Sequence, residues 1–375
     1  MKIVHVAASV APQYGGPSAA LPPTCVALAD RGHDVHLVTT TRGFARGVTS
    51  LDPDAFAGLR VEYHPTVAPQ RWGTAPALAR SLRRHMGSTD VVHIHSLYLF
   101  HAAAAATIAR VARVPYIIRP HGTLDGYHRA RHATQKRLYD SALQARLIRG
   151  AAGIHAMSWA EADEINELHL GVPVFVVPHG VAVPAATAND DPRRSRSILF
   201  LGRIARKKRV DLVARAFIDL ASTDAEVRLT LAGPDDDGSL GPANALFHQY
   251  GLQGRVSLPG FVGLEAKERL LEGSAVFVLP SDAENFGIAV LEALAHRLPV
   301  VLSRHVALAG KVDAVGAGLI VEQTPRAVAD AIATIMGNPT LAHEMGKRGR
   351  QLVENEFGWP RVAEALEARY LAVAR

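Results

Sequence analysis

The chain has 375 residues, of which 48% are hydrophobic and 20% are charged. This is the composition of a globular protein too long for one ordinary core. Its single cysteine, Cys25, excludes a disulfide framework and a cysteine-rich zinc site, so we expect a reducing, cytoplasmic location. No apolar run reaches the roughly 18 residues of a membrane span. The start, MKIVHVAASVAPQYGG, is typical of a first strand rather than of a signal peptide.

The net charge of +6 is unevenly distributed. Residues 1–185 hold 18 Lys and Arg against 12 Asp and Glu, whereas residues 186–375 hold 23 of each. One interpretation is an arginine-rich solvated surface. The other is attraction of the N-terminal half to an anionic partner, such as a phospholipid surface or a lipid-phosphate acceptor. Nucleic acid is disfavoured, because only 6% of the residues are aromatic and no basic-aromatic pattern occurs.

Short apolar runs alternate with helical stretches along the first half. The predicted strands are KIVHVAA, DVHLVTT, DVVHIHS, YIIRPHG, GIHAMS and VFVVPHG. The predicted helices between them include PSAALPPTCVALADRG, HAAAAATIARVAR and ATQKRLYDSALQARLIRG. Continuous apolar strands that alternate with helices indicate a parallel sheet covered on both faces.

The pattern restarts after residues 184–196, which have no periodicity and are interpreted as a linker. The second half then contains the runs SILFLGR, VRLTLAGP, RVSLPGF, AVFVLPS, PVVLS and GLIVE. The sequence therefore predicts two doubly wound α/β domains that join near residue 190 and face each other across a cleft. In such sheets, ligands bind beyond the carboxyl ends of the strands.

The loops after the first-half strands carry polar or glycine-rich candidates. Gly15 and Gly16 precede a helix, where backbone N–H groups can approach an anion, although two glycines also make an ordinary turn. His121 follows the YIIRP strand and is placed to contact a sugar hydroxyl. His93 and His95 point to one side of their strand. Without a third ligand in view, a structural or acceptor-side contact is favoured there over a metal.

In the second half, Gly202 and Arg203 follow the SILFLG strand, and Lys208 lies in a basic run before a helix. Cations are disfavoured at a helix N-terminus unless an anion binds between them, and a diphosphate fits that description. The alternative is a solvated basic turn.

The stretch SDAENFGIAVLEALA places the amides of Asn285, Phe286 and Gly287 at a predicted helix start, where phosphate or sugar oxygens bind. Glu284 lies in the loop and can bind sugar hydroxyls. Glu292 lies among apolar residues, and a buried carboxylate needs hydrogen-bond donors. Two ribose hydroxyls would supply them; the alternatives are a salt bridge to a nearby arginine or a solvent-facing position on the helix.

Taken together, these segments resemble the retaining, nucleotide-sugar-dependent glycosyltransferases of the GT-B fold, specifically family 4, the glycosyl transferases group 1. The resemblance covers essentially the whole chain and rests on ENFGIAVLEALA with its E-x7-E spacing, FLGRIARKKRVDL, QYGGPS, RPHGTLD and FGWPRVAEALEARY. It implies two Rossmann-like domains, an acceptor-side domain in residues 1–186 and a donor-binding domain in residues 187–357. The helix in residues 358–375 would return to the N-terminal domain.

The resemblance also implies residue roles. Glu292 would bind the ribose of the donor, and Glu284, with the amides that follow it, would hold the donor sugar. Arg203 and Lys208 would neutralise the leaving diphosphate. Gly16 would donate an amide on the phosphate side, and His121 would contact the sugar near the anomeric centre.

The implied reaction moves a hexose from a UDP- or GDP-linked donor to an acceptor hydroxyl with retention. It uses no obligatory cofactor or metal. No carboxylate nucleophile is evident, which fits same-face attack assisted by the leaving phosphate and differs from the two-carboxylate glycosidase scheme.

Two residues depart from the family pattern: Arg209 and Arg297 stand where glycine is usual. Asp-x-Asp occurs at Asp52–Asp54 and at Asp235–Asp237, and such pairs bind metal in transferases of the other major fold. The latter pair lies in GPDDDG, which we interpret as a solvated turn.

The alternatives to a transferase are a nucleotide-sugar 2-epimerase on the same fold and a non-catalytic nucleotide-sugar binder. For a transferase, the acceptor is either a saccharide or lipid-linked saccharide in polysaccharide or glycolipid synthesis, or a soluble small molecule. The basic stretch in residues 128–149 could contact the inner face of the membrane peripherally, as an amphipathic helix.

Overall fold

The computed structural model describes residues 1–11, 14, 16–44, 56, 58–67, 72–124, 145–185 and 196–374. The chain divides into two compact units. Unit 1 comprises Met1–Gly180 and Trp359–Arg375, and unit 2 comprises Val181–Gly358. Gly15, Asp52–Asp54, most of the basic stretch in residues 128–149 and most of the expected linker lie outside the described residues.

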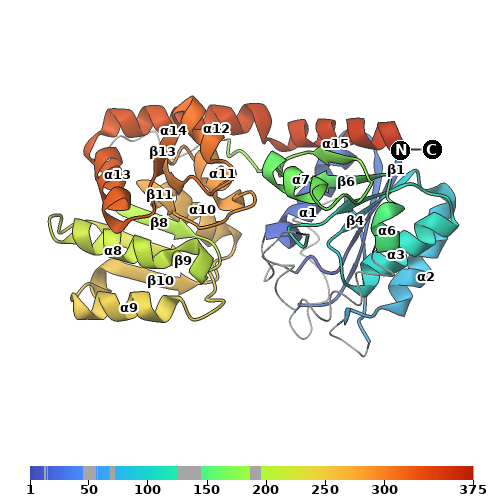
Figure 1. Ribbon diagram of the computed structural model, residues 1–375, viewed down its shortest axis with the longest axis horizontal. Helices are drawn as coiled ribbons and strands as arrows, with labels where there is room; N and C mark the ends of the chain where they lie inside the picture. Colours follow the sequence, from blue (N-terminus) through green and yellow to red (C-terminus); the bar gives the residue numbers. More distant parts are fainter. Residues whose placement is uncertain are drawn as a thin grey trace. The chain divides into compact units, whose positions relative to one another are not determined.

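Unit 1 is built on a seven-stranded parallel sheet of strand order β3-β2-β1-β4-β5-β6-β7. Figure 1 labels three of these strands, β1, β4 and β6. Its strands are β1 Lys2–Ala7, β2 Asp34–Thr40, β3 Arg60–His64, β4 Val91–His95, β5 Tyr116–Arg119, β6 Gly153–Ala156 and β7 Val174–Val176. Its described helices are α1 Gly16–Ala29, α2 Pro76–His85, η4 Met86–Ser88, α3 Phe100–Val111, α6 Ala145–Arg149, α7 Trp159–Asn166 and α15 Trp359–Val373.

Unit 2 is built on a six-stranded parallel sheet of strand order β10-β9-β8-β11-β12-β13. Its strands are β8 Ser197–Leu201, β9 Arg228–Ala232, β10 Val256–Gly260, β11 Val276–Leu279, β12 Val300–Ser303 and β13 Gly318–Val321. Its helices are η7 Arg206–Lys208, α8 Val210–Ala221, α9 Leu240–Gln249, η8 Gln253–Arg255, α10 Leu264–Gly273, α11 Ile288–Ala295, α12 Ala309–Val315, α13 Pro325–Gly337 and α14 Pro339–Glu356.

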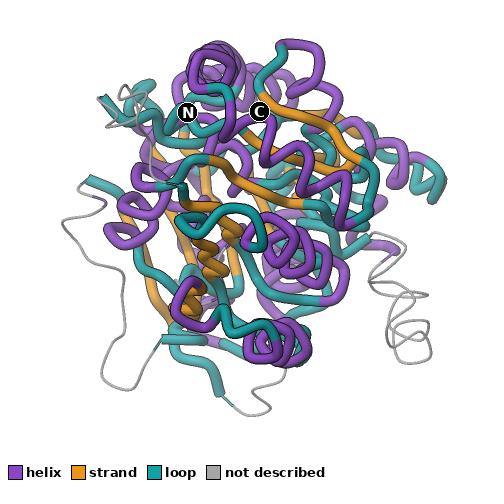
Figure 2. The backbone as a smooth tube through the Cα atoms, turned by 90° about the vertical axis from the view of Figure 1, so that its left-hand side faces the viewer, coloured by secondary structure: helices purple, strands orange, loops and turns teal. Residues whose placement is uncertain are grey.

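The strands form because their side chains are apolar on both faces. In β1, Val4 and Val6 belong to one buried cluster of unit 1, whereas Ile3 and Ala7 belong to another on the opposite face. This alternation is the period-two geometry of a strand covered by helices on both sides. Figure 2 shows strands flanked by helices in this way. Both sheets confirm the predicted α/β class.

Helix ends are set by local sequence. The Ser158 hydroxyl accepts a hydrogen bond from the Glu161 amide at the start of α7. Thr324 and Asn338 cap α13 and α14 in the same manner, each followed by a proline at the first helical position. One strand, β3, was not predicted, because its sequence RVEYH is charged and lacks the apolar run of its neighbours.

Helix α15 completes unit 1 by packing on α1 (Figure 1). Its Val362, Ala363, Leu366 and Tyr370 are buried in the same cluster as Ile3 and Leu37. The last segment of the chain is thereby part of the N-terminal unit. No helix among the described residues is both long and apolar enough to cross a membrane.

Candidate functional site

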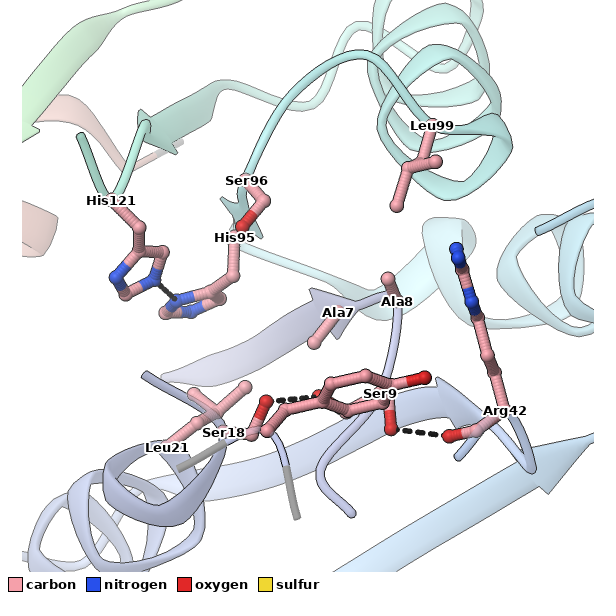
Figure 3. A pocket seen from close by; sticks show the side chains of 11 residues that line it. Ala7, Ala8, Ser9, Ser18, Leu21, Arg42, His95, Ser96, Leu99 and His121 are labelled. Atoms are coloured by element: carbon pink, nitrogen blue, oxygen red, sulfur yellow. Dashed lines mark hydrogen bonds between the residues drawn. The ribbon is translucent and has the colours of Figure 1, made fainter. Parts of the chain in front are cut away.

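Unit 1 contains a cavity of about 240 Å³ at the carboxyl ends of its central strands (Figure 3). Ala7, Ala8 and Ser9 line it from the end of β1, and His95 and Ser96 line it from the end of β4. Further lining residues are Tyr14, Ser18, Leu21, Arg42, Leu99 and His121. The cavity therefore lies where a doubly wound sheet places its ligands.

Three histidines form a hydrogen-bonded row that ends at the cavity. His5 Nδ1 lies 3.0 Å from His95 Nε2. His95 Nδ1 lies 3.1 Å from His121 Nε2, as Figure 3 shows. Burial lowers the pKa of His5 to about 3 and holds the pKa values of His95 and His121 well below 6.5, with the nearby Arg119 acting in the same direction. All three rings are therefore neutral at pH 7.

Neutrality couples the tautomers of these rings. Each ring carries one N–H, and His95 must donate to one neighbour and accept from the other. If the protons point toward the cavity, His121 Nδ1 is an N–H donor; if they point away, it is an acceptor. His121 Nδ1 is buried and has no hydrogen-bond partner within the described residues. The direction of the protons along the row therefore decides whether His121 Nδ1 donates a hydrogen bond to a ligand or accepts one from it.

A buried glutamate holds the turn that carries His121. Glu161 accepts hydrogen bonds from the amides of Gly122, at 3.1 Å, and Met157, at 2.7 Å. His121 has a left-handed backbone, with φ of 54°, as do Ser96 and Tyr98 after β4. Non-glycine residues in this conformation are strained and often occur at functional sites. Burial lowers the pKa of the neighbouring Arg119 to about 10, against the charge of Glu161.

The predicted residues of unit 1 have different positions. His121 and His95 line the cavity, whereas His93 turns to Tyr370 of α15, whose hydroxyl lies 2.7 Å from its Nδ1. Gly16 begins α1 with φ of 28°. Three polar residues that line the cavity, Ser9, Ser18 and Arg42, were not predicted from the sequence. Their positions just after strands or at the start of a helix could have indicated them.

In unit 2, the basic loop after β8 is only partly buried. Gly202 has φ of 149°, and its carbonyl oxygen would lie 1.9 Å from a Cβ added to Gly233, so the two backbones touch. Arg203 is 61% exposed and contacts Asp236 at 2.9 Å. The side chain of Lys208, at the end of η7, is only 13% exposed.

The structure brings Lys208 and Glu284 into direct contact. The Lys208 ammonium donates a hydrogen bond to Glu284 Oε2, and both side chains are more than four-fifths buried. Burial, with the charges of Lys207 and Arg203, lowers the pKa of Lys208 to about 7. Loops after β8 and β11 therefore join into one polar site.

Backbone contacts hold the Glu284 loop. The Glu284 amide donates to His305 O at 3.1 Å, and Glu284 O accepts from the Ala307 amide at 3.0 Å. Phe286 is buried, 6.1 Å from Phe357 between ring centroids. Gly287, with φ of 84°, is the N-cap of α11, so Asn285, Phe286 and Gly287 lead directly into the helix. Their predicted amide contacts stay predictions.

Glu292 is not an unpaired carboxylate. It accepts a hydrogen bond from the ammonium of Lys267 on α10, and its side chain is 18% exposed. The salt bridge left open by the sequence is therefore present, formed by a lysine.

The two departures from the family pattern keep a glycine-like backbone. Arg209 and Arg297 both have left-handed φ values, 54° and 55°. Arg209 is further held by Asp211 and Asp282. The Asp235–Asp237 segment is exposed. Asp235 accepts a hydrogen bond from the Gly238 amide within its own turn, and Asp237 accepts one from the amide of Arg206 at the start of η7.

Fold and loop geometry define a two-unit α/β protein with polar sites beyond the carboxyl ends of both parallel sheets. Residues 15–180 match the family described as Glycosyl transferase 4-like domain, and residues 187–352 match the family described as Glycosyl transferases group 1. The chain belongs to the glycosyl transferases group 1 family and is a glycosyltransferase.

Curated relatives support this assignment. The glycogen synthase of Mycobacterium tuberculosis (strain ATCC 25618 / H37Rv) is 30% identical over 303 residues, covering 76% of this chain and 69% of the relative. A GDP-mannose:cellobiosyl-diphosphopolyprenol alpha-mannosyltransferase of Xanthomonas oryzae pv. oryzae is 26% identical over 365 residues, covering 96% and 94%.

Solved structures share the fold over the full length. A sucrose-phosphate synthase from Thermosynechococcus elongatus has a TM-score of 0.76 at 20% identity, covering 99% of this chain and 98% of that one. Anabaena HepE, in complex with UDP and glucose, has a TM-score of 0.76 at 17% identity, covering 99% and 100%. Both confirm the GT-B architecture.

Proposed function

We propose that the chain is a retaining hexosyltransferase that uses a UDP- or GDP-linked sugar, bound by unit 2. The contact between Lys208 and Glu284 carries this proposal. One cation and one carboxylate, both largely buried, meet at the carboxyl edge of a parallel sheet, where a diphosphate and a sugar hydroxyl would find complementary charges. Anabaena HepE has been solved with UDP-glucose, and the Xanthomonas relative is named for GDP-mannose.

In the proposed reaction, Lys208 and Arg203 neutralise the charge that develops on the leaving diphosphate. The acceptor oxygen attacks the anomeric carbon from the face that the diphosphate leaves. The bond between that carbon and the phosphate oxygen breaks, and the acceptor proton passes to the leaving phosphate. Glu284 holds a hydroxyl of the donor sugar, Glu292 the ribose, and Asn285, Phe286 and Gly287 offer backbone amides. Gly202 and Gly16 allow the backbone to approach the donor phosphates closely, and His121 contacts the sugar.

For the acceptor, we propose a saccharide or lipid-linked saccharide bound at the unit 1 cavity. Hydroxyls of Ser9, Ser18 and Tyr14 and the guanidinium of Arg42 line this cavity, which suits a polyhydroxylated ligand with a negative charge. The excess positive charge of residues 1–185 supports peripheral contact with an anionic membrane. Sedimentation with vesicles containing anionic lipid, but not with neutral vesicles, is the expected sign of that contact.

Release of free nucleotide tests the reaction class. The chain is incubated with UDP- and GDP-sugars and a panel of glycolipid and oligosaccharide acceptors. A transferase releases UDP or GDP in proportion to the acceptor glycosylated, and NMR of the product shows the anomeric configuration of the donor. An epimerized sugar without acceptor dependence, or binding without turnover, would overturn the proposal.

A further inference from the structure

A group of metal-ligating side chains lies at the outer edge of the unit 1 sheet, and none of its members lines the cavity. It contains His36 of β2, Glu62 of the edge strand β3 and His85 in the last turn of α2. One ligand atom from each residue lies within 4.8 Å of the other two. Neither the family resemblance nor the proposed reaction uses these residues.

Sheet register and helix packing bring the three residues together. Arg60 pairs with His36 and Glu62 with Val38 across β2 and β3, so His36 and Glu62 share one face. Helix α2 covers this face, and its Leu78 and Leu82 are buried in the same cluster as Val38. His85, one turn beyond Leu82, thereby stacks near His36, with ring centroids 4.9 Å apart.

Hydrogen bonds orient the carboxylate and one imidazole. The fully buried Ser81 hydroxyl donates to Glu62 Oε2, and His85 Nε2 lies 2.6 Å from Glu62 Oε1. Asp34 Oδ1 lies 3.1 Å from His36 Nε2. The contacts from Ser81 and Asp34 come from outside the group, and such outer contacts fix the orientation of metal ligands.

We propose that His36, Glu62 and His85 form a Zn²⁺ site that holds α2 on the edge of the sheet. Bonds of about 2.1 Å to a tetrahedral Zn²⁺ place ligand atoms about 3.4 Å apart. The observed separations, from 2.6 Å to less than 4.8 Å, bracket that value, so small side-chain rotations suffice. The fourth ligand is water or His64. The Nε2 atom of His64 lies 3.5 Å from Glu62 Oε2 and makes no hydrogen bond within the described residues.

Carboxylates and cations both surround the site. Glu62 and Asp34 supply two carboxylates, and the charges of Lys2 and Arg84 act on His36 and His64. The Arg60 guanidinium lies 3.1 Å from Asp34 Oδ1 and 3.4 Å from His36 Nε2. Arg60 is 68% exposed, so it can move into solvent when a metal binds.

A second group, His5, His93 and His95, also has ligand atoms within 4.8 Å but offers a poorer site. It holds no carboxylate, and the buried Arg119 lowers the pKa values of all three rings further. A dication there would add charge beside a buried guanidinium. The edge group has the mixed nitrogen and oxygen donors that Zn²⁺ prefers.

Zn²⁺ titration of the whole chain, stripped with EDTA and dialysed, tests this site by isothermal calorimetry. We expect one equivalent to bind, with affinity at least tenfold weaker in Glu62→Gln and in His85→Ala. Removal of the competing cation in Arg60→Ala should tighten binding several-fold. His343→Ala removes an exposed histidine of unit 2 and should change nothing. Co²⁺ in place of Zn²⁺ should give the visible absorption of a tetrahedral ion.

Melting curves of the EDTA-treated variants show that each one is folded before titration. Glu62→Gln keeps the shape of the side chain, so the test stands even if His85→Ala does not fold. Absence of a stoichiometric site in the wild type would overturn the proposal. So would equal affinity in the wild type and Glu62→Gln, since that places the metal on other histidines.

Discussion

Lys208 meets the Glu284 carboxylate where a diphosphate is proposed to bind. The pair satisfies two largely buried charges that would otherwise be costly to hold away from water. In the proposed reaction, an arriving diphosphate would compete with Glu284 for the ammonium, and a sugar hydroxyl would then become the partner of the carboxylate. The contact thus links the phosphate and sugar ends of one proposed site.

The lowered pKa of Lys208 predicts a pH-dependent affinity for UDP or GDP. The charged form binds the diphosphate, and it is lost as pH rises through about 7. The dissociation constant should therefore increase by up to tenfold per pH unit between pH 7 and 9. Calorimetry on the wild type and on Lys208→Arg, which stays charged, checks this. The same slope in both proteins would contradict it.

Single substitutions test whether the histidine row stabilises unit 1. His95→Leu leaves facing nitrogens of His5 and His121 without partners, and each buried unsatisfied group costs about 1–3 kcal/mol. We expect unit 1 to unfold at a clearly lower urea concentration. Hydrogen exchange of the unit 1 amides measures this midpoint. His169→Asn, at an exposed histidine of the same unit whose left-handed backbone asparagine also adopts, should change the midpoint little. Equal midpoints for the two variants would refute the structural role.

At the level of elements, the first residue of α15 packs closely against Gly180. A Cβ at Gly180 would lie 2.1 Å from Cε3 of Trp359, the first residue of α15, and a ring cannot bend away as a flexible chain does. Gly180→Ala should therefore destabilise unit 1 by about 1–3 kcal/mol. Thermal melting checks this against Gly241→Ala, where a Cβ meets nothing within 4 Å. A Gly180→Ala melting temperature equal to the wild type would show that α15 adjusts freely.

Elements with continuous apolar runs could be predicted from the sequence, since both faces of each central strand are buried. The edge strand β3 could not, because Arg60, Glu62 and His64 interrupt any apolar pattern and face helix α2 instead. Loop residues after strands were predictable as a class from the carboxyl-end rule. Their partners were not: Glu161 reaches Gly122 from 39 positions away, and Lys208 reaches Glu284 from 76.

For the whole molecule, buried histidines are concentrated in unit 1. His5, His93, His95, His101, His121, His155 and His179 all have pKa values lowered by burial, with those of His5 and His179 near 3. Unit 2 buries one histidine among its residues, His296. The two units should therefore respond differently to acid.

The direction in which the stability of unit 1 changes with pH follows from proton binding. Below pH 6.5 the unfolded chain binds protons that these folded rings refuse, so stability is complete above that pH and is lost as pH falls toward 3. Each ring contributes about 1.4 kcal/mol per pH unit, and several together match a typical domain stability of about 5–15 kcal/mol. Hydrogen exchange should show unit 1 opening between pH 6 and 4.5 before unit 2. Simultaneous opening, or earlier opening of unit 2, would contradict this.

The central claim is a nucleotide-sugar site in unit 2, and a thermal-shift panel tests it most directly. UDP, GDP, ADP and their common sugars are added to the wild type, Glu292→Ala and Glu268→Ala, the last being an exposed glutamate on α10. Ligand at about 100 times its dissociation constant adds about 2.7 kcal/mol of stability. The account predicts a shift with a UDP or GDP ligand in the wild type and Glu268→Ala, and its loss in Glu292→Ala. No shift with any nucleotide in the folded wild type would contradict it.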